Sequence, residues 1–146
     1  MAYRGKYKPT KPEKYDGDPT TIVYRSLLER RFMVYCDNTP SILKWSSEEV
    51  VIPYVSPIDN RVHRYFVDFM IRYIDVKGNI RTSLIEVKPY LQTMEPKKKT
   101  TGAKPTRRYI TEVMTWGVNQ AKWKAATAYC DDRKWEFKLL TEKQLT

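Results

Sequence analysis

The chain has 146 residues, and its 27 Lys and Arg residues outnumber 17 Asp and Glu residues, for a formal net charge of +10. This length suits one domain that buries roughly two-thirds of its unfolded surface. The positive excess favours a polyanionic partner, nucleic acid before a membrane surface, because no apolar run reaches the roughly 20 residues of a spanning helix. The first residues also lack the apolar segment of a secretory signal. We therefore expect a protein that is made and kept in a cytosol.

Few side chains are available for nucleophilic or zinc chemistry. Cys36 and Cys130 are the only cysteines, and we expect both as buried, reduced thiols. The single histidine, His63, lies in a polar stretch and is expected at the surface. This set lacks the ligand spacing of a zinc finger and the partners of a Cys/His or Ser/His catalytic site. No P-loop motif is present either, which argues against ATP as a fuel.

Residues 1–18 are basic and rich in Pro, Gly and Tyr, without a period that could bury one face. We expect an N-terminal arm here and a single domain over 19–146. The arm interleaves basic side chains with Tyr3, Tyr7 and Tyr15, a pattern that can lie on phosphates and stack on bases. A solvated arm, or one that docks on a protein partner, is an equal alternative.

Residues 18–38 predict the first helix, with Asp18 as N-cap and Pro19 at the first helical position. Its spacing of three and four predicts a buried stripe. The stripe contains Tyr24, Leu27, Leu28, Phe32 and Tyr35. Glu29 then lies at the border of the buried face and is expected to be half-buried. The alternative is a surface glutamate paired with Arg25 or Arg30.

Residues 43–57 and 63–91 are rich in β-branched and aromatic side chains, and Lys77-Gly78-Asn79 is a turn signal. We expect three antiparallel strands. A charged loop over 92–108 follows. It is either an exposed loop without a partner or a loop that binds the phosphate backbone of a nucleic acid. Its basic side chains are Lys97, Lys98, Lys99, Lys104, Arg107 and Arg108.

Residues 109–130 predict a second helix, and 134–142 a final strand. The expected buried side of this helix has mostly small or apolar residues, namely Ile110, Val113, Met114, Gly117, Ala121, Ala125 and Ala128. The order helix, three strands, helix, strand predicts an α/β or α+β fold. In this fold two helices flank a mixed central sheet.

Two strands carry carboxylates among apolar neighbours. Asp68 shares a face of its strand with Phe66 and Met70, whereas Glu86 and Lys88 lie on one face about 7 Å apart. Burying an unpaired carboxylate costs several kcal/mol, so each acid needs a partner. Two acids on adjacent strands repel, and one stays protonated unless a cation lies between them.

The partner is either Lys88 in a half-buried salt bridge or a divalent cation. One lysine cannot neutralise two or three acids, and such bridges seldom stabilise more than the apolar residues they displace. Mg²⁺ or Mn²⁺ prefers hard oxygen ligands, which the Asp68 and Glu86 carboxylates, the Val87 carbonyl and Glu29 could supply. Lys88 would then orient or help deprotonate a bound water, and the metal would stabilise charge on a phosphate.

This constellation resembles the PD-(D/E)xK nuclease superfamily, in which an acid on one strand is followed by Glu-x-Lys on the next. The matching positions are Asp68, Glu86 and Lys88, with Glu29 in "YRSLLE" as the acid of the preceding helix. Gln120 in "VNQAKW" is similar to a residue that contacts phosphate on the following helix. The resemblance implies an α-β-β-β-α-β core and a metal-dependent nuclease.

The blocks "KWSSEEVVIPY" and "HRYFVDF" extend the likeness over nearly the whole chain, which resembles the head completion nucleases of T-even-like tailed phages. That resemblance implies cutting of packaged DNA so that filled heads join tails. It also implies portal or neck proteins as partners, and a location in the infected-host cytoplasm or the virion. The core alone is similar to the endonuclease subunits of bacterial cut-and-paste transposons. The alternatives are a non-catalytic head or neck connector and a transposase-type or repair endonuclease.

Overall fold

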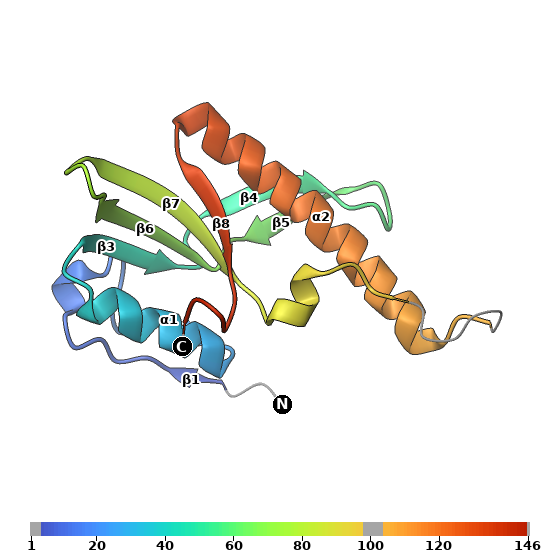
Figure 1. Ribbon diagram of the computed structural model, residues 1–146, viewed down its shortest axis with the longest axis horizontal. Helices are drawn as coiled ribbons and strands as arrows, with labels where there is room; N and C mark the ends of the chain where they lie inside the picture. Colours follow the sequence, from blue (N-terminus) through green and yellow to red (C-terminus); the bar gives the residue numbers. More distant parts are fainter. Residues whose placement is uncertain (1–3, 98–103, 146) are drawn as a thin grey trace.

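A four-stranded mixed sheet lies between two α-helices in the computed structural model, which describes residues 4–97 and 104–145 (Figure 1). The strand order is β3-β6-β7-β8, antiparallel except that β8 runs parallel to β7. This confirms the predicted class, a mixed sheet flanked by two helices. The elements of this layered core are α1 (Leu27–Asn38), β3 (Ile42–Ser47), β6 (Phe69–Ile74), β7 (Ile80–Val87), α2 (Arg107–Arg133) and β8 (Glu136–Leu140).

A separate hairpin, β4 (Val51–Val55) and β5 (Val62–Phe66), precedes β6 and packs under α2. The expectation of three antiparallel strands is right for β3, β6 and β7 but misses this second sheet. The chain bends between β5 and β6, where the Val67 N–H donates to the Val50 carbonyl and the Glu48 N–H to the Asp68 carbonyl. The run 43–57 therefore contains most of β3 and all of β4, and the run 63–91 contains most of β5 and all of β6 and β7.

Helix α1 begins later than its sequence indicated. Its N-cap is Ser26, whose hydroxyl accepts a hydrogen bond from the Glu29 N–H at 3.2 Å. Asp18 instead closes a turn with Thr20, and the intervening chain forms β2 (Val23–Tyr24), paired with β1 (Gly5–Lys6). The buried face of α1 also differs from the predicted stripe. Leu27 and Tyr35 are exposed, and the buried positions are Phe32, Met33, Cys36 and Asp37.

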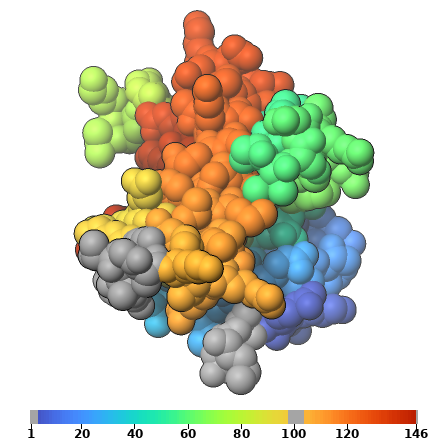
Figure 2. Space-filling view, turned by 90° about the vertical axis from the view of Figure 1, so that its right-hand side faces the viewer, coloured from blue at the N-terminus to red at the C-terminus, as the bar shows by residue number. Residues whose placement is uncertain are grey.

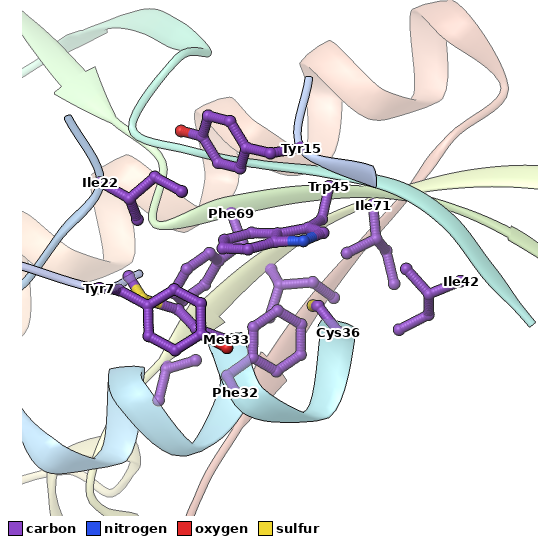
Figure 3. Close-up of a cluster of buried hydrophobic side chains, with 12 residues drawn as sticks. Tyr7, Tyr15, Ile22, Phe32, Met33, Cys36, Ile42, Trp45, Phe69 and Ile71 are labelled. Carbon is purple, nitrogen blue, oxygen red and sulfur yellow. The ribbon is translucent and has the colours of Figure 1, made fainter. Parts of the chain in front are cut away.

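The N-terminal segment belongs to the core. Tyr7 and Tyr15 are buried around Trp45, as Figure 3 shows. The Tyr7 hydroxyl donates to the Asp37 carboxylate, and η1 (Pro12–Lys14) brings Lys14 to the end of α1. The expectation of a detached arm is therefore wrong for these side chains, because partners about 30 positions away in sequence fix them.

Strand alternation divides the core between the two helices. Ile85 and Val87 face the α1 side together with Phe69, whereas Leu84 packs with Trp123 of α2. The predicted alternation along β7 is thus confirmed. The free cysteines are both buried, as expected: Cys36 packs with the residues on the α1 side of the sheet and Cys130 with those on the α2 side.

Helix α2 is longer than the predicted 109–130, and its first turns extend beyond the sheet (Figure 1). Ile110, Val113 and Met114 are consequently exposed, contrary to expectation. The buried positions, Asn119, Trp123, Ala126 and Cys130, lie in the part that crosses the sheet and the hairpin. Among the helices described, none has the length and apolar character required to span a membrane.

Candidate active site

Asp68 and Glu86 come together because β6 and β7 pair side by side. Phe69 lies opposite Ile85 in the antiparallel register, so the next position outward brings Asp68 alongside Glu86. The Val87 N–H donates to Asp68 Oδ2 at 2.9 Å. This bond orients the aspartate from the strand that carries the glutamate.

Glu86 is only 5% exposed, and both of its oxygens have a neighbour. Oε1 accepts a hydrogen bond from the Tyr65 hydroxyl at 2.8 Å, and Oε2 lies 3.7 Å from Lys88 Nζ. The second distance is that of an ion pair rather than a hydrogen bond. Burial, followed by the Glu86 charge, raises the pKa of Tyr65, which keeps its proton on the phenol.

Glu29 is half-buried in the first turn of α1, as predicted. Its N–H donates to Ser26 Oγ, and its own Oε2 accepts from the Arg25 N–H at 3.0 Å, a variant of the capping box. Burial raises the pKa of Glu29, and the charges of Glu48 and Glu86 add to this effect. The Ser-x-x-Glu pattern at 26–29 is the sequence signal that marks the true start of the helix.

Burial and the neighbouring acids oppose ionisation of Asp68 beside Glu86. Burial raises the pKa of Asp68 well above its usual range, and the nearby charge of Glu86 raises it further, as does Glu29. The Val87 N–H and Lys88 act in the opposite direction without cancelling it. One lysine therefore does not neutralise the three acids, as the sequence argument required.

The donor set fits a hard divalent cation. Within residues 4–97 and 104–145 no three Asp, Glu, His or Cys groups form a ready-made metal cage. Mg²⁺, however, usually takes one or two protein carboxylates and keeps several waters. Asp68 and Glu86 supply two such carboxylates, and Glu29 lies close enough to influence both acids electrostatically.

The remaining predicted site residues that the structure describes lie on or near α2. Gln120 is exposed, and no hydrogen bond among the described residues joins it to the carboxylates. Lys97 and Arg108 line a pocket of about 820 Å³ between α2 and the segment that follows β7 and contains η2 (Tyr90–Thr93). Figure 2 shows α2 on this face, with the hairpin on one side and that segment on the other. Arg107 is exposed in the first turn of α2, and Lys98 and Lys99 lie outside the described residues.

Two neighbours of the site were missed by sequence reasoning. Tyr65 fixes Glu86 from β5, and only the register of the unpredicted hairpin brings it there. The Arg25 guanidinium pairs with Glu48 rather than with Glu29, through contacts of 3.0 Å from Nε and 3.2 Å from Nη2. No local pattern indicates this pair, because the two residues are 23 positions apart.

Two comparisons with known proteins show what the chain is similar to. Residues 39–142 match the family described as TnsA-like endonuclease N terminal, a range that contains Asp68, Glu86 and Lys88. The chain is also 41% identical to a protein named head completion nuclease from Enterobacteria phage T4, over 99% of this chain and 95% of that protein. The second match extends to the helix that carries Glu29.

Proposed function

The chain belongs to the TnsA-like endonuclease family, and we propose that it is a Mg²⁺- or Mn²⁺-dependent deoxyribonuclease that hydrolyses phosphodiester bonds. The observation that supports this best is the pair Asp68 and Glu86, two adjacent carboxylates beside Lys88 at one edge of the sheet. Their mutual repulsion is relieved most simply by a divalent cation. Glu29 completes the acidic set from α1.

Each side chain has a distinct role in this proposal. Asp68, Glu86 and the Val87 carbonyl would hold the ion, which when bound supplies a Lewis acid that stabilises charge developing on the phosphate. The Val87 N–H and the Tyr65 hydroxyl hold the two carboxylates in position. Lys88 donates hydrogen bonds that orient the attacking water and a phosphate oxygen, and it screens the approaching anion from the acids.

For the biological setting, we infer from the name of the T4 relative, a head completion nuclease, that this chain acts in head completion. In this setting it would act on packaged DNA before filled heads join tails. Portal or neck proteins are the expected partners, and the infected-host cytoplasm or the virion is the expected location. The net charge of +10 supports DNA as the substrate.

Cleavage of plasmid and linear DNA with Mg²⁺, Mn²⁺ or EDTA tests the activity. Asp68→Asn, Glu86→Gln and Lys88→Ala should each lower the metal-dependent rate by about 100-fold or more. Glu136→Gln is the matched control, because Glu136 is an exposed strand glutamate that also pairs with a lysine two positions away. This control should cleave at the wild-type rate.

Two results would count against the proposal. Cleavage by all three site variants at the wild-type rate would move the chemistry to other residues. DNA that is bound but left intact by the wild-type protein with either metal would favour the non-catalytic connector instead.

A further inference from the structure

Arg25 and Glu48 form an exposed, two-contact ion pair at the edge of the candidate site. Nε and Nη2 of Arg25 lie 3.0 and 3.2 Å from the two carboxylate oxygens of Glu48. The side chains are 51% and 34% exposed, so solvent reaches the pair. Ion pairs with this exposure contribute little to stability, and another anion can replace the carboxylate at low cost.

The backbones of both residues hold them against the acids of the site. The Arg25 N–H donates to Glu29 Oε2 at 3.0 Å, and the Glu48 N–H donates to the Asp68 carbonyl at 3.1 Å. Arg25 is also close enough to the Asp68 carboxylate for their charges to interact. The guanidinium is therefore fixed beside the same carboxylates that Lys88 approaches from β7.

The charge balance explains why a second cation is needed there. A DNA strand that enters the site meets Glu29, Asp68 and Glu86, three acids, and Lys88 is the cation paired with one of them. An arginine fork matches a phosphate as well as it matches a carboxylate, since both present two oxygens in one plane. The two oxygens that the Arg25 fork contacts in the structure are those of the Glu48 carboxylate.

The backbone of Glu48 is unusual as well. Its φ of 56° is left-handed, a conformation that costs a side chain other than glycine some strain. The residue keeps this conformation at the bend after β3, where its N–H bonds to Asp68 and its carboxylate reaches Arg25. Strain of this kind gathers at binding and switching sites more often than in ordinary loops.

We propose that Arg25 binds a backbone phosphate of the DNA strand next to the cleaved bond, and that Glu48 holds its guanidinium until the phosphate displaces it. The inference rests on the proposed function and adds a phosphate site to it. When DNA binds, the Arg25 guanidinium exchanges the Glu48 carboxylate for a phosphate, and the Glu48 carboxylate is left in contact with solvent. Removal of the two side chains should therefore have opposite effects on DNA binding.

Binding of a short duplex DNA, measured by fluorescence anisotropy in EDTA over a series of salt concentrations, tests this without any catalysis. Arg25→Gln should weaken binding about 10-fold and reduce the salt slope by about one. Glu48→Gln should tighten binding severalfold, because it frees the fork and removes a negative charge. Arg25→Lys, which keeps the charge but loses the fork, should fall between wild type and Arg25→Gln.

Arg81→Gln is the matched control, because Arg81 is also half-exposed and paired with a carboxylate, that of Asp75, at the far end of β7. It should change affinity less than Arg25→Gln does. Glu48→Gln that weakens binding, or Arg25→Gln that equals the Arg81→Gln control, would overturn the proposal and leave the pair as a clamp between β3 and α1. The thermal midpoint of each variant separates loss of a contact from loss of folding.

Failure of this inference can be distinguished from failure of the nuclease proposal. If the wild-type protein cleaves no DNA, the binding measurements in EDTA still decide the role of Arg25. If it does cleave, Arg25→Gln should raise KM by a larger factor than it lowers kcat, since the phosphate contact exists before the chemical step. An unchanged KM with a reduced kcat would contradict a binding role.

Discussion

The backbone N–H of Val87 donates to the carboxylate of Asp68 at 2.9 Å, so the strand that carries Glu86 also orients the second acid. Two carboxylates are thereby held together at the edge of the sheet although burial raises the pKa of Asp68 and the charge of Glu86 raises it further. An arrangement that opposes ionisation is typical of a functional site rather than of a stabilising one.

Asp68→Asn should stabilise the protein in EDTA at neutral pH. The pKa of Asp68 in the folded protein lies above its ordinary value of 3.8. The folded wild-type protein therefore binds this proton more tightly than the unfolded chain does, and its free energy of unfolding falls as pH rises through the raised pKa. The variant lacks this loss, and the gain should be about 0.5–2 kcal/mol. Thermal unfolding between acidic and neutral pH measures it.

Asp59→Asn provides a control of opposite sign. The Arg61 N–H and then His63 lower the pKa of the exposed Asp59, so its contribution is present at neutral pH and lost as pH falls. Asp59→Asn should not raise the thermal midpoint at neutral pH. An Asp68→Asn protein that melts below the wild type in EDTA at neutral pH would show that Asp68 is a structural acid.

Tyr65→Phe should destabilise the fold and slow cleavage together. The substitution removes the O–H that satisfies the buried Glu86, at a cost of about 1–3 kcal/mol, and it frees the carboxylate to rotate. Urea unfolding and metal-dependent cleavage are the measurements. Tyr35→Phe is the control, because Tyr35 is exposed, and it should match the wild type in both assays. Equal cleavage by both variants would remove Tyr65 from the site.

Lys14→Met should lower stability by about 1–2 kcal/mol. The ammonium donates to the carbonyls of Cys36 at 2.6 Å and Thr39 at 2.9 Å, and the last turn of α1 has no basic residue of its own. Urea unfolding checks the loss. Lys11→Met, an exposed neighbour, should leave stability unchanged. A DNA-binding arm would instead make both substitutions weaken DNA affinity equally and leave the unfolding midpoint unaltered.

Lys97→Gln should reduce the slope of DNA affinity against salt concentration by about one, because each phosphate contact releases about one counterion. Lys97 lines the pocket beside α2 together with Arg108, and both side chains are exposed. Lys77→Gln, at the turn between β6 and β7, serves as the control for general charge. Equal slopes for the two variants would mean that this pocket does not meet phosphates.

The core of the site could be predicted because it depends on local pattern. Glu86 lies in β7, and Asp68 and Lys88 each lie one residue beyond the end of an apolar strand, so that strand alternation assigns each side chain to a face. The placement of Glu29 on the first helix is correct although the predicted N-cap is wrong, because a helix that begins after either Asp18 or Ser26 includes Glu29. The ligand role of these residues remains a prediction.

The rest depends on contacts between distant residues. The local sequence around Tyr7 predicts a solvated arm, whereas in the structure Tyr7 contacts Asp37 and Trp45, which are distant in sequence. Ile110 is exposed because the first turns of α2 extend beyond the sheet. The spacing of apolar residues along the helix does not indicate where the sheet ends. Tyr65 and Arg25 reach the site through the hairpin register and an ion pair across 23 positions.

The most direct test is a crystal structure of the wild-type protein soaked in Mn²⁺, with the metal located by anomalous scattering. We expect one peak about 2 Å from an oxygen of Asp68 and from an oxygen of Glu86, with the Val87 carbonyl as a further ligand. A structure without this peak, in which Lys88 moves within hydrogen-bond distance of Glu86, would contradict a metal-dependent nuclease built on these two acids.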